Sequence, residues 1–516
     1  MRYVYGVTAA LLLGGAAATL TLQPVGAQTA QNEPGAITVP RNGAPPSFAD
    51  LVERLQPAVV NISTRQSVQM RQRALPPGFE EFFRRFGAPV PEGDGGDTVT
   101  QRGGSLGSGF VISADGYIVT NNHVVAPARP DAVIEQITVT LSDRTEYEAE
   151  VVGRDQLADI AVLKVTPRRP LPFVRFGDSS QVRVGEWVVA IGNPFGLGGT
   201  VTAGIVSAVH RNINAGLYDR YIQTDASINS GNSGGPMFDL QGNVIGINTA
   251  LISPTGGNVG IGFAIPAEQV RPVVDALRRG ERVRRGYVGV GLQDIDEGVA
   301  AALGIDRNRG ELIRTVTPGG PADRAGIRQG DVVISVAGQP VTPDQTLAYL
   351  VSRQDIGARV PFEIIRNGRR STVAVTIAER PTEEELARLN NLEPDEATVP
   401  EPSKADEQSA GQRSTQGSLG LSVQTLTPDI ARRLRITDGN IRGVVVAAVE
   451  PNSDAGQKGI RPGHVILSIN QTATPTPEAA ASAIAEARRA GRESVLLLVR
   501  TGNGPPTYVG VALSGD

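Results

Sequence analysis

The stretch Gly231-Asn232-Ser233-Gly234-Gly235-Pro236 is the part of the sequence from which the fold class follows. Its serine stands between glycines, so the hydroxyl can project from a tight turn with little side-chain bulk nearby, as a nucleophile requires. The backbone N–H groups of Gly231 and Ser233 can then point at one spot and hold the negative oxygen of a tetrahedral intermediate. Gly-Asn and Gly-Gly pairs also form ordinary hairpin turns, so the hexapeptide by itself leaves both interpretations open.

The same glycines match the G-x-S-x-G nucleophile elbow of α/β-hydrolases, and so does Gly103-x-Ser105-x-Gly107. An elbow needs a helix directly after its serine. The segment from Pro236 to Ile247 instead has the pattern of strand, Gly-Asn turn and strand. This pattern disfavours an esterase of the α/β class and favours a mainly β domain.

Length and composition narrow the class of protein. The 516 residues exceed what one core accommodates and indicate about three domains. Short Val and Ile runs between many of the 61 glycines predict mostly β structure. The net charge of −4 gives no reason to expect nucleic acid as a partner. The lack of cysteine excludes thiol nucleophiles and Cys-ligated zinc, and no metal or cofactor is called for.

The N-terminus has the pattern of a targeting segment. Arg2 precedes the apolar run Val7 to Leu22, and Val25-Gly26-Ala27 supplies small residues before a cleavage point. We therefore expect residues 1–27 to be a cleavable signal peptide and residues 28–47 a flexible leader. An uncleaved membrane anchor is the alternative, although the run is short for a span.

Residues 48–280 are predicted to form one β-rich domain. Short alternating runs from Gly107 to Ile265 favour closed antiparallel barrels or sandwiches, and Ala267 to Arg279 is predicted to be a helix. Residues 65–105 form an unusually long insertion. Four phenylalanines inside it share one face of a helical pattern, and they either pack on their own domain or contact another subunit or the site; they are Phe79, Phe82, Phe83 and Phe86.

The last part of the chain is an internal repeat. The pattern Val316-x-Pro318-x3-Ala322-x3-Gly326-Ile327-Arg328-x-Gly330-Asp331-Val332 aligns without a gap on Val449-x-Pro451-x3-Ala455-x3-Gly459-Ile460-Arg461-x-Gly463-His464-Val465. Two copies of one small domain are therefore predicted, at 286–380 and 417–513. The Glu-, Pro-, Ser- and Gln-rich residues 381–416 between them are predicted to be a flexible linker.

A nucleophilic serine needs a base, and the chain has three histidines. His464 replaces Asp331 of the first copy and belongs to the repeat, while His210 stands at the polar end of a strand. His123 ends an apolar strand within the β-rich domain and is the best candidate.

The imidazole in turn needs an acceptor that fixes its tautomer. Asp159 is a carboxylate at the head of the apolar strand Ile160 to Val165, where burial favours a partner. Asp155 and Asp178 are equally possible as strand-end caps, as is Asp159 itself. The order His, Asp, Ser is that of chymotrypsin-like proteases.

Three blocks resemble the active-site blocks of the HtrA (Deg) serine proteases. They are Thr120-Asn121-Asn122-His123-Val124-Val125, Asp159-Ile160-Ala161-Val162-Leu163-Lys164, and the run from Gln223 to Pro236. With a signal peptide before the domain and two PDZ-like copies after it, the chain is most similar to the periplasmic DegP/DegQ (Do) type. The resemblance implies a mainly β fold: a trypsin-like double β-barrel protease domain followed by two PDZ domains.

The resemblance also implies site residues. The catalytic triad would be His123, Asp159 and Ser233, with an oxyanion hole from the amides of Gly231, Asn232 and Ser233. Ser227 stands where trypsin-like enzymes specific for Lys or Arg carry an acid, so a small aliphatic residue is expected before the cleaved bond. The substrate-binding residues are expected to be Ser227, Ile247, Asn248, Thr249, the PDZ loop Tyr287-Val288-Gly289-Val290 and its counterpart Leu419-Gly420-Leu421-Ser422, of which the first loop fits the family pattern better.

The expected function is that of an ATP-independent periplasmic serine endopeptidase that degrades unfolded proteins, with chaperone activity. Its partners would be unfolded proteins or peptides, hydrophobic C-termini at the PDZ domains, and other copies of itself in trimers and their multiples. Segments 65–105, 207–219 and 248–258 would be regulatory or activation loops. The rival interpretation is a chaperone or PDZ scaffold whose protease site is mostly switched off.

Overall fold

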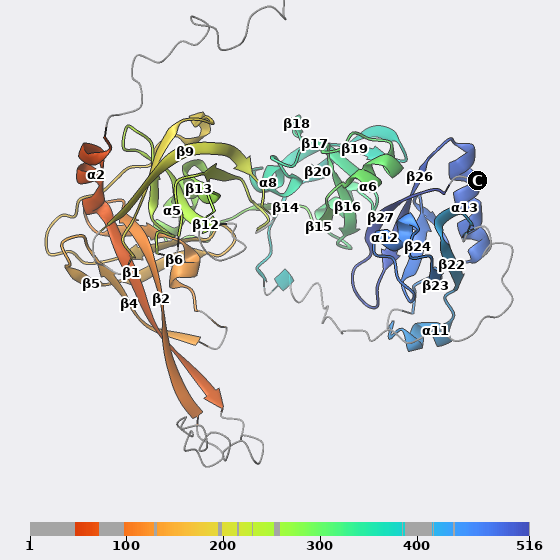
Figure 1. The fold of residues 1–516 in the computed structure, drawn as a ribbon, viewed down its shortest axis with the longest axis horizontal. Helices are drawn as coiled ribbons and strands as arrows, with labels where there is room; N and C mark the ends of the chain where they lie inside the picture. The colour runs from red at the N-terminus through yellow and green to blue at the C-terminus, as the bar shows by residue number, and fades with distance from the viewer. Residues whose placement is uncertain are drawn as a thin grey trace, which may run out of the picture. The chain divides into compact units, whose positions relative to one another are not determined.

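The computed structural model describes most of the chain from Ser47 onward (Figure 1). The described residues are 47–71, 98–127, 129, 132–194, 199–213, 216–229, 231–251, 259–383, 385–386, 415, 417–436 and 439–514. The expected signal peptide, the leader, the four phenylalanines of the insertion and most of the linker 381–416 lie outside them. No helix in this part of the chain is long and apolar enough to span a membrane.

The first sheet of the β-rich domain has seven strands in the order β5-β4-β1-β2-β3-β7-β6. Its alternating sequence buries one face, and Val60, Ile62, Ile118 and Leu163 are among the residues of its core. The strands are β1 Val59–Arg71, β2 Thr98–Val111, β3 Tyr117–Thr120, β4 Ala132–Thr140, β5 Glu146–Glu148, β6 Glu150–Asp155 and β7 Ile160–Lys164. The short helix α2 (Ala49–Leu55) precedes β1 in the chain.

Both ends of the predicted insertion at 65–105 belong to strands and not to a loop. β1 and β2 stay paired from Val59↔Phe110 out to Arg71↔Thr98, and Figure 1 shows them as an extended hairpin. Only residues 72–97 between the two strands lie outside the described chain. Polar and glycine residues in this stretch obscure the period-two pattern on which a strand prediction depends.

The second sheet closes into a six-stranded barrel in the order β10-β13-β12-β11-β8-β9. Val188, Val206, Ile222 and Met237 pack inside it. Its strands are β8 Trp187–Gly192, β9 Thr200–Arg211, β10 Tyr221–Thr224, β11 Pro236–Phe238, β12 Val244–Leu251 and β13 Gly262–Pro266. The sequence predicts two closed barrels, and only the second sheet closes. In the first sheet, the edge strands β5 and β6 do not pair with each other, so its described strands form an open barrel.

Helix α5 (Ala267–Arg278) follows the barrel, as its periodicity predicts. Its apolar face buries Val270, Val274 and Leu277. The structure also contains the short 3-10 helices η1 Gln56–Ala58 and η2 Ser179–Gln181.

The two repeat copies have the same strand order, which confirms the internal repeat. The first copy is ordered β15-β16-β17-β19-β20 with β18 beside β17, and the second β22-β23-β24-β26-β27 with β25 beside β24. The first contains β14 Gly286–Tyr287, β15 Val290–Gln293, α6 Glu297–Leu303, β16 Glu311–Val316, α7 Pro321–Ala325, β17 Val332–Val336, β18 Gln339–Pro340, α8 Leu347–Ser352, β19 Arg359–Arg366, β20 Arg369–Thr376 and β21 Ala378–Glu379. The second contains β22 Leu421–Thr425, α11 Pro428–Arg433, β23 Val444–Val449, α12 Asp454–Gln457, β24 Val465–Ile469, β25 Thr472–Ala473, α13 Pro477–Arg489, β26 Ser494–Arg500 and β27 Thr507–Ala512.

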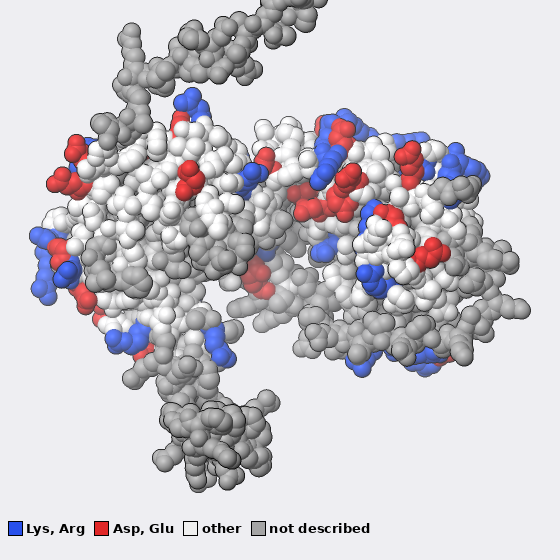
Figure 2. All heavy atoms as spheres, viewed as in Figure 1, with Lys and Arg blue, Asp and Glu red and all other residues white. Residues whose placement is uncertain are grey.

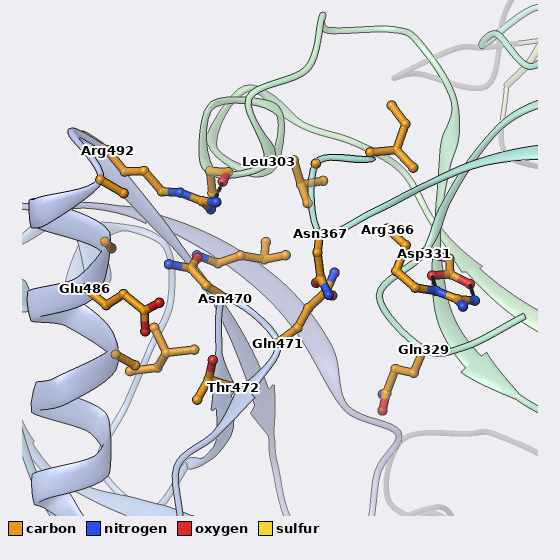
Figure 3. Close-up of a pocket in the computed structure, with 18 of the residues that line it drawn as sticks. Leu303, Gln329, Asp331, Arg366, Asn367, Asn470, Gln471, Thr472, Glu486 and Arg492 are labelled. Atoms are coloured by element: carbon orange, nitrogen blue, oxygen red, sulfur yellow. Dashed lines mark hydrogen bonds and ion pairs between the residues drawn. The ribbon is translucent and has the colours of Figure 1, made fainter. Parts of the chain in front are cut away.

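His464 and Asp331 have the same structural role in their copies. The Asp331 carboxylate accepts the amide of Arg328 at 2.8 Å, and the His464 Nδ1 accepts the amide of Arg461 at 3.4 Å. Figure 3 shows Arg366 facing Asp331 beside a pocket, and its guanidinium makes an ion pair of 2.6 Å with that carboxylate. His464 is therefore a turn residue of the repeat, as its alignment predicts.

Acidic and basic side chains are interspersed on the face of the molecule drawn in Figure 2. This distribution agrees with the small net charge of −4.

Glu311 is a buried carboxyl in the first repeat copy. It begins β16 with 7% of its surface exposed, and its Oε2 accepts the amide of Leu347 at 3.3 Å, at the start of α8. Burial, together with the negative charge of Asp294, raises the pKa of Glu311 from 4.5 to about 7. The folded domain therefore binds this proton more tightly than the unfolded chain.

We expect the wild type to lose stability as pH rises from 4.5 to 7, and Glu311→Gln to lack this loss. Because the folded-state pKa is raised, the unfolded chain loses its proton first, and the free energy of unfolding falls as pH rises through this window. At pH 8 the variant should be more stable by up to about 3 kcal/mol, and near pH 4.5 the two proteins should be alike. Differential scanning calorimetry of the full chain at both pH values measures this, with the exposed Glu363→Gln as control; equal shifts for both variants would contradict it.

Candidate active site

The segment that carries His123 leaves β3 and turns into the four-residue helix α4 (Asn122–Val125). The sequence predicts that His123 itself ends a strand, but the strand stops at Thr120 and His123 lies in α4. Asp159 lies in the turn between β6 and β7. These two turns face each other because β3 and β7 are paired, with Thr120 opposite Ala161.

Asp159 has a left-handed backbone with φ of 53°, which a residue other than glycine adopts only when its surroundings hold it there. Its carbonyl oxygen accepts the amide of Asn122 at 3.0 Å and the side-chain amide of Asn121 at 2.9 Å. The Asn122 amide and the Asn121 side chain thereby fix the turn that carries the carboxylate.

The His123 and Asp159 side chains form a direct pair. His123 Nδ1 lies 2.7 Å from Asp159 Oδ2, and the His123 amide donates to Oδ1 of the same carboxylate at 2.9 Å. A carboxylate on Nδ1 fixes the tautomer that leaves Nε2 as the acceptor. The imidazole side chain is 49% exposed, so it is open to a substrate.

Thr249 is a further partner of this pair that the sequence does not reveal. Its hydroxyl donates to Asp159 Oδ2 at 3.0 Å, although Thr249 is expected from the sequence only as a substrate contact. Nothing local distinguishes this threonine, because 90 residues separate it from Asp159 and only the tertiary fold brings the two together.

The turn around Ser233 lies between β10 and β11, and no helix follows it. β11 (Pro236–Phe238) comes directly after the turn, so the nucleophile-elbow arrangement is absent. Gly231 and Gly234 both have left-handed φ values, 106° and 83°, which explains the glycines in the motif.

Asn248 and Ile247 support this turn from β12 instead of facing solvent. Both side chains are 0% exposed. The carbonyl oxygen of Asn248 accepts the amide of Gly234 at 2.7 Å, and its side chain donates to the Pro236 carbonyl oxygen at 3.2 Å. Both residues are fully buried in this structure, and their expected contact with a substrate stays a prediction.

Of the three amides expected in the oxyanion hole, that of Asn232 is already engaged. It donates to the carbonyl oxygen of Asn229 at 3.1 Å. Its side chain joins the turn to the preceding loop, accepting from the Asn229 amide and donating to the Ser227 carbonyl oxygen, each at 3.0 Å. The amides of Gly231 and Ser233 donate to no other residue within the described chain, so they are the two donors left for an oxyanion.

The glycines also bring the Ser233 turn against the histidine segment. A Cβ atom added to Gly234 would lie 2.3 Å from both the Ser108 carbonyl oxygen and Thr120 Oγ1. The carbonyl oxygen of Ser233 accepts the amide of Ser108 at 2.8 Å. Within the described residues, however, the Ser233 hydroxyl and the imidazole are not hydrogen-bonded, and catalytic hydrogen bonds are often long in the absence of substrate.

Ser227 occupies the loop before the turn and is half-buried. Its carbonyl oxygen also accepts the Thr202 hydroxyl at 3.0 Å. Ala226 and Ile228 on either side are buried. A Cβ on Gly262 would lie 2.5 Å from Ile228, so the neighbouring strand packs closely against this loop.

The other acids and histidines have different roles. Asp155 accepts the amides of Leu157 and Ala158 and makes an ion pair of 2.7 Å with Arg285. Asp178 caps the 3-10 helix η2 by accepting the amide of Ser180, and not the end of a strand as the sequence suggests. Burial lowers the pKa of His210, which lies at the end of β9.

The two PDZ loops lead into strands at the edge of their sheets. β15 and β22 each stand first in the strand order, so one side of each is free of a described partner strand. Gly289 and Gly420, which precede them, have left-handed φ values of 76° and 69°. An edge strand behind such a loop is the arrangement that accepts an added peptide strand.

Known protein families match all three parts of the chain. Residues 107–247 match the model of the trypsin-like peptidase domain, and residues 286–377 and 408–500 each match a PDZ domain. The chain is 41% identical to a probable periplasmic serine endoprotease DegP-like of Brucella melitensis biotype 1, over 97% of this chain and 96% of that protein. It is 40% identical to the protein of the same name in Rhizobium meliloti, over 95% and 97%.

Solved structures of HtrA-type proteases are also similar to this chain. The HtrA-type protease AlgW with a decapeptide matches with a TM-score of 0.52 and 37% identity, over 65% of this chain and 99% of that one. AlgW with a tripeptide matches with a TM-score of 0.52 and 36% identity, over 66% and 99%.

We expect Gly234→Ala to destabilise the β-rich domain far more than Gly260→Ala does. The two glycines have nearly the same φ, 83° and 85°, but a Cβ at 234 meets two oxygens at 2.3 Å whereas a Cβ at 260 meets nothing within 4 Å. Gly260→Ala should therefore lower the free energy of unfolding only by the cost of a left-handed alanine, about 1 kcal/mol. Gly234→Ala should lower it by about 2 kcal/mol or more in addition, because the new methyl group overpacks the site. Thermal unfolding of both variants measures the difference, and equal losses would refute the close approach.

Proposed function

The chain belongs to the DegP-like family of HtrA serine endoproteases, and on that premise we propose that it hydrolyses unfolded proteins with Ser233 as nucleophile. The observation that carries the proposal is the 2.7 Å contact between His123 Nδ1 and Asp159 Oδ2. The glycine-rich turn of Ser233 packs against the segment that leads to His123. The order of these three residues and their placement on paired strands and facing turns both support it.

In the proposed mechanism, His123 Nε2 takes the proton of the Ser233 hydroxyl as its oxygen attacks the peptide carbonyl carbon. Asp159 holds the imidazole and stabilises its positive charge. The amides of Gly231 and Ser233 bind the oxyanion. The protonated His123 then gives its proton to the leaving amine, and water releases the acyl group from Ser233 by the same steps.

The substrates proposed are unfolded or misfolded proteins of the periplasm, where the named relatives act. Ser227 brings no carboxylate to the loop before the nucleophile, which supports cleavage after small aliphatic residues instead of Lys or Arg. The edge strands β15 and β22 support capture of hydrophobic C-termini at the PDZ domains. A role in protein quality control, with chaperone activity, follows from these substrates.

We also propose export by the N-terminal signal peptide, with the boundaries given by the sequence, and assembly into trimers and their multiples. The first rests on Arg2, the apolar run and the small residues before Ala27. The second rests on the resemblance of the whole chain to its family.

We expect Ser233→Ala to abolish cleavage of a reduced, unfolded model protein by the full chain. The rate should fall by at least about 10⁴-fold, because alanine has no group to form the acyl-enzyme. Gel analysis of the digestion measures the loss.

The same variant separates the protease from its rival, a chaperone whose site is switched off. Within the described residues no hydrogen bond joins the Ser233 hydroxyl to the His123 imidazole, and a site held permanently in that state would leave only the chaperone function. Equal and slow digestion by the wild type and Ser233→Ala, together with equal suppression of aggregation, would support the chaperone alone.

We expect Thr249→Ala to lower kcat by about tenfold. Its hydroxyl donates to a charged acceptor at 3.0 Å, and such a bond contributes about 1.5 kcal/mol, which corresponds to about tenfold in rate. Thr249→Ser keeps the hydroxyl and should retain most of the activity. Steady-state cleavage of a fluorogenic peptide measures both, and equal losses would show that the methyl group and not the hydroxyl matters.

A further inference from the structure

Ser108 is a fully buried serine of β2 whose polar groups all contact the site. Its hydroxyl donates to the Gly231 carbonyl oxygen at 2.5 Å and accepts the amide of Asn193 at 2.8 Å. Its amide donates to the Ser233 carbonyl oxygen at 2.8 Å, and its carbonyl oxygen accepts the Thr120 hydroxyl at 2.7 Å. One residue of the first sheet thus holds the nucleophile turn, the end of β8 and the strand before His123.

We propose that Ser108 is a positioning residue that fixes the oxyanion-binding amides of Gly231 and Ser233. The inference rests on the proposed function and adds to it the group that keeps the oxyanion hole formed.

The reason lies in the peptide unit between Gly231 and Asn232. Its carbonyl oxygen is held by the Ser108 hydroxyl, and its N–H donates to the Asn229 carbonyl oxygen at 3.1 Å. This unit stands between the two amides that are left to bind an oxyanion. When both of its ends are held, the two amides keep one relative orientation.

Gly231 cannot hold this orientation by itself. It has a φ of 106° and no side chain, so its own torsional preferences allow several orientations of the neighbouring peptide units. Preorganised donors contribute to catalysis because they need no rearrangement as the negative charge develops. A fixed external contact to the Gly231 carbonyl oxygen supplies that preorganisation.

The space around Ser108 favours a serine. An added Cβ on Gly192 would lie 3.1 Å from the Ser108 Oγ, and one on Gly235 would lie 3.3 Å from the Ser108 Cβ. A larger side chain at 108 would therefore press on these backbones. Asn61 supports the same region, since its side chain donates to the carbonyl oxygens of Asn193 and Gly107 at 2.9 and 3.3 Å.

Ser108→Ala in the full chain tests the proposal. Because Ser108 is 0% exposed, substrate binding should change little, so we expect kcat to fall by about 10- to 100-fold with KM within about twofold. A peptide boronic acid with a small aliphatic terminal residue forms a tetrahedral adduct with the serine, and its affinity should fall in parallel. The matching peptide amide, which forms no adduct, should bind as it does to the wild type.

Ser179→Ala is the matched control. Ser179 is a buried serine of the same domain whose hydroxyl accepts the amide of Glu268 at 2.9 Å, so Ser179→Ala removes a part-buried hydrogen bond to a backbone amide, as Ser108→Ala removes the one from Asn193. We expect some loss of thermal stability and no change in kcat. Should Ser108→Ala fail to fold, Ser108→Cys keeps a weak donor of similar shape and should give an intermediate kcat.

The outcomes separate the proposals. Folded Ser108→Ala with kcat and boronic acid affinity within about twofold of the wild type overturns the role of Ser108, and so does a change confined to KM. Equal loss of kcat in Ser179→Ala shows a general structural effect and overturns it as well. Failure of the wild type to cleave more than Ser233→Ala instead refutes the proposed function.

Discussion

The site depends on one steric constraint, the approach of the Ser233 turn to the backbone of β2 and β3. At Gly234 the approach leaves no room for a Cβ atom, since the Ser108 carbonyl oxygen and Thr120 Oγ1 would each lie at 2.3 Å. Only glycine tolerates this distance together with a φ of 83°. Because Thr120 directly precedes the histidine segment, the close approach brings the proposed nucleophile turn against the segment of the proposed base. The hydrogen bond from Ser108 to the Ser233 carbonyl oxygen holds it there.

The proposed catalytic pair of His123 and Asp159 is held by backbone groups as well as by side chains. The turn at Asp159 is held in a strained conformation by Asn121 and Asn122, and its carboxylate then receives His123 Nδ1, the His123 amide and the Thr249 hydroxyl. A carboxylate held by several donors keeps its direction. The two residues before His123 therefore help to position the proposed pair, which fits a resemblance that extends over a block and not over single residues.

The PDZ copies show how one sequence pattern supports two different side chains at one position. Asp331 and His464 both accept an amide three residues earlier, from Arg328 and Arg461, but Asp331 also pairs with Arg366. The turn needs an acceptor and not a charge. Glu311, by contrast, is a buried carboxyl whose pKa is raised to about 7, so the first copy contains a proton-linked element in its core.

Much of this protein follows from the sequence by itself. The glycines around Ser233, the order of His123, Asp159 and Ser233, the β-rich domain with α5 and the repeat at the C-terminal end are all local patterns, and such patterns depend on turn geometry and on side-chain periodicity. The family resemblance adds the trypsin-like fold. These features need no long-range contact to be recognised.

Only the tertiary structure decided which groups complete the site. It engages the Asn232 amide with Asn229, turns Ile247 and Asn248 inward, joins Thr249 to Asp159 and places the buried Ser108 hydroxyl on Gly231. It also extends β1 and β2 into the predicted insertion. The physical reason is that these contacts join residues far apart in the chain, 123 residues in the case of Ser108 and Gly231, and no local pattern encodes which distant backbone group will meet a given hydroxyl.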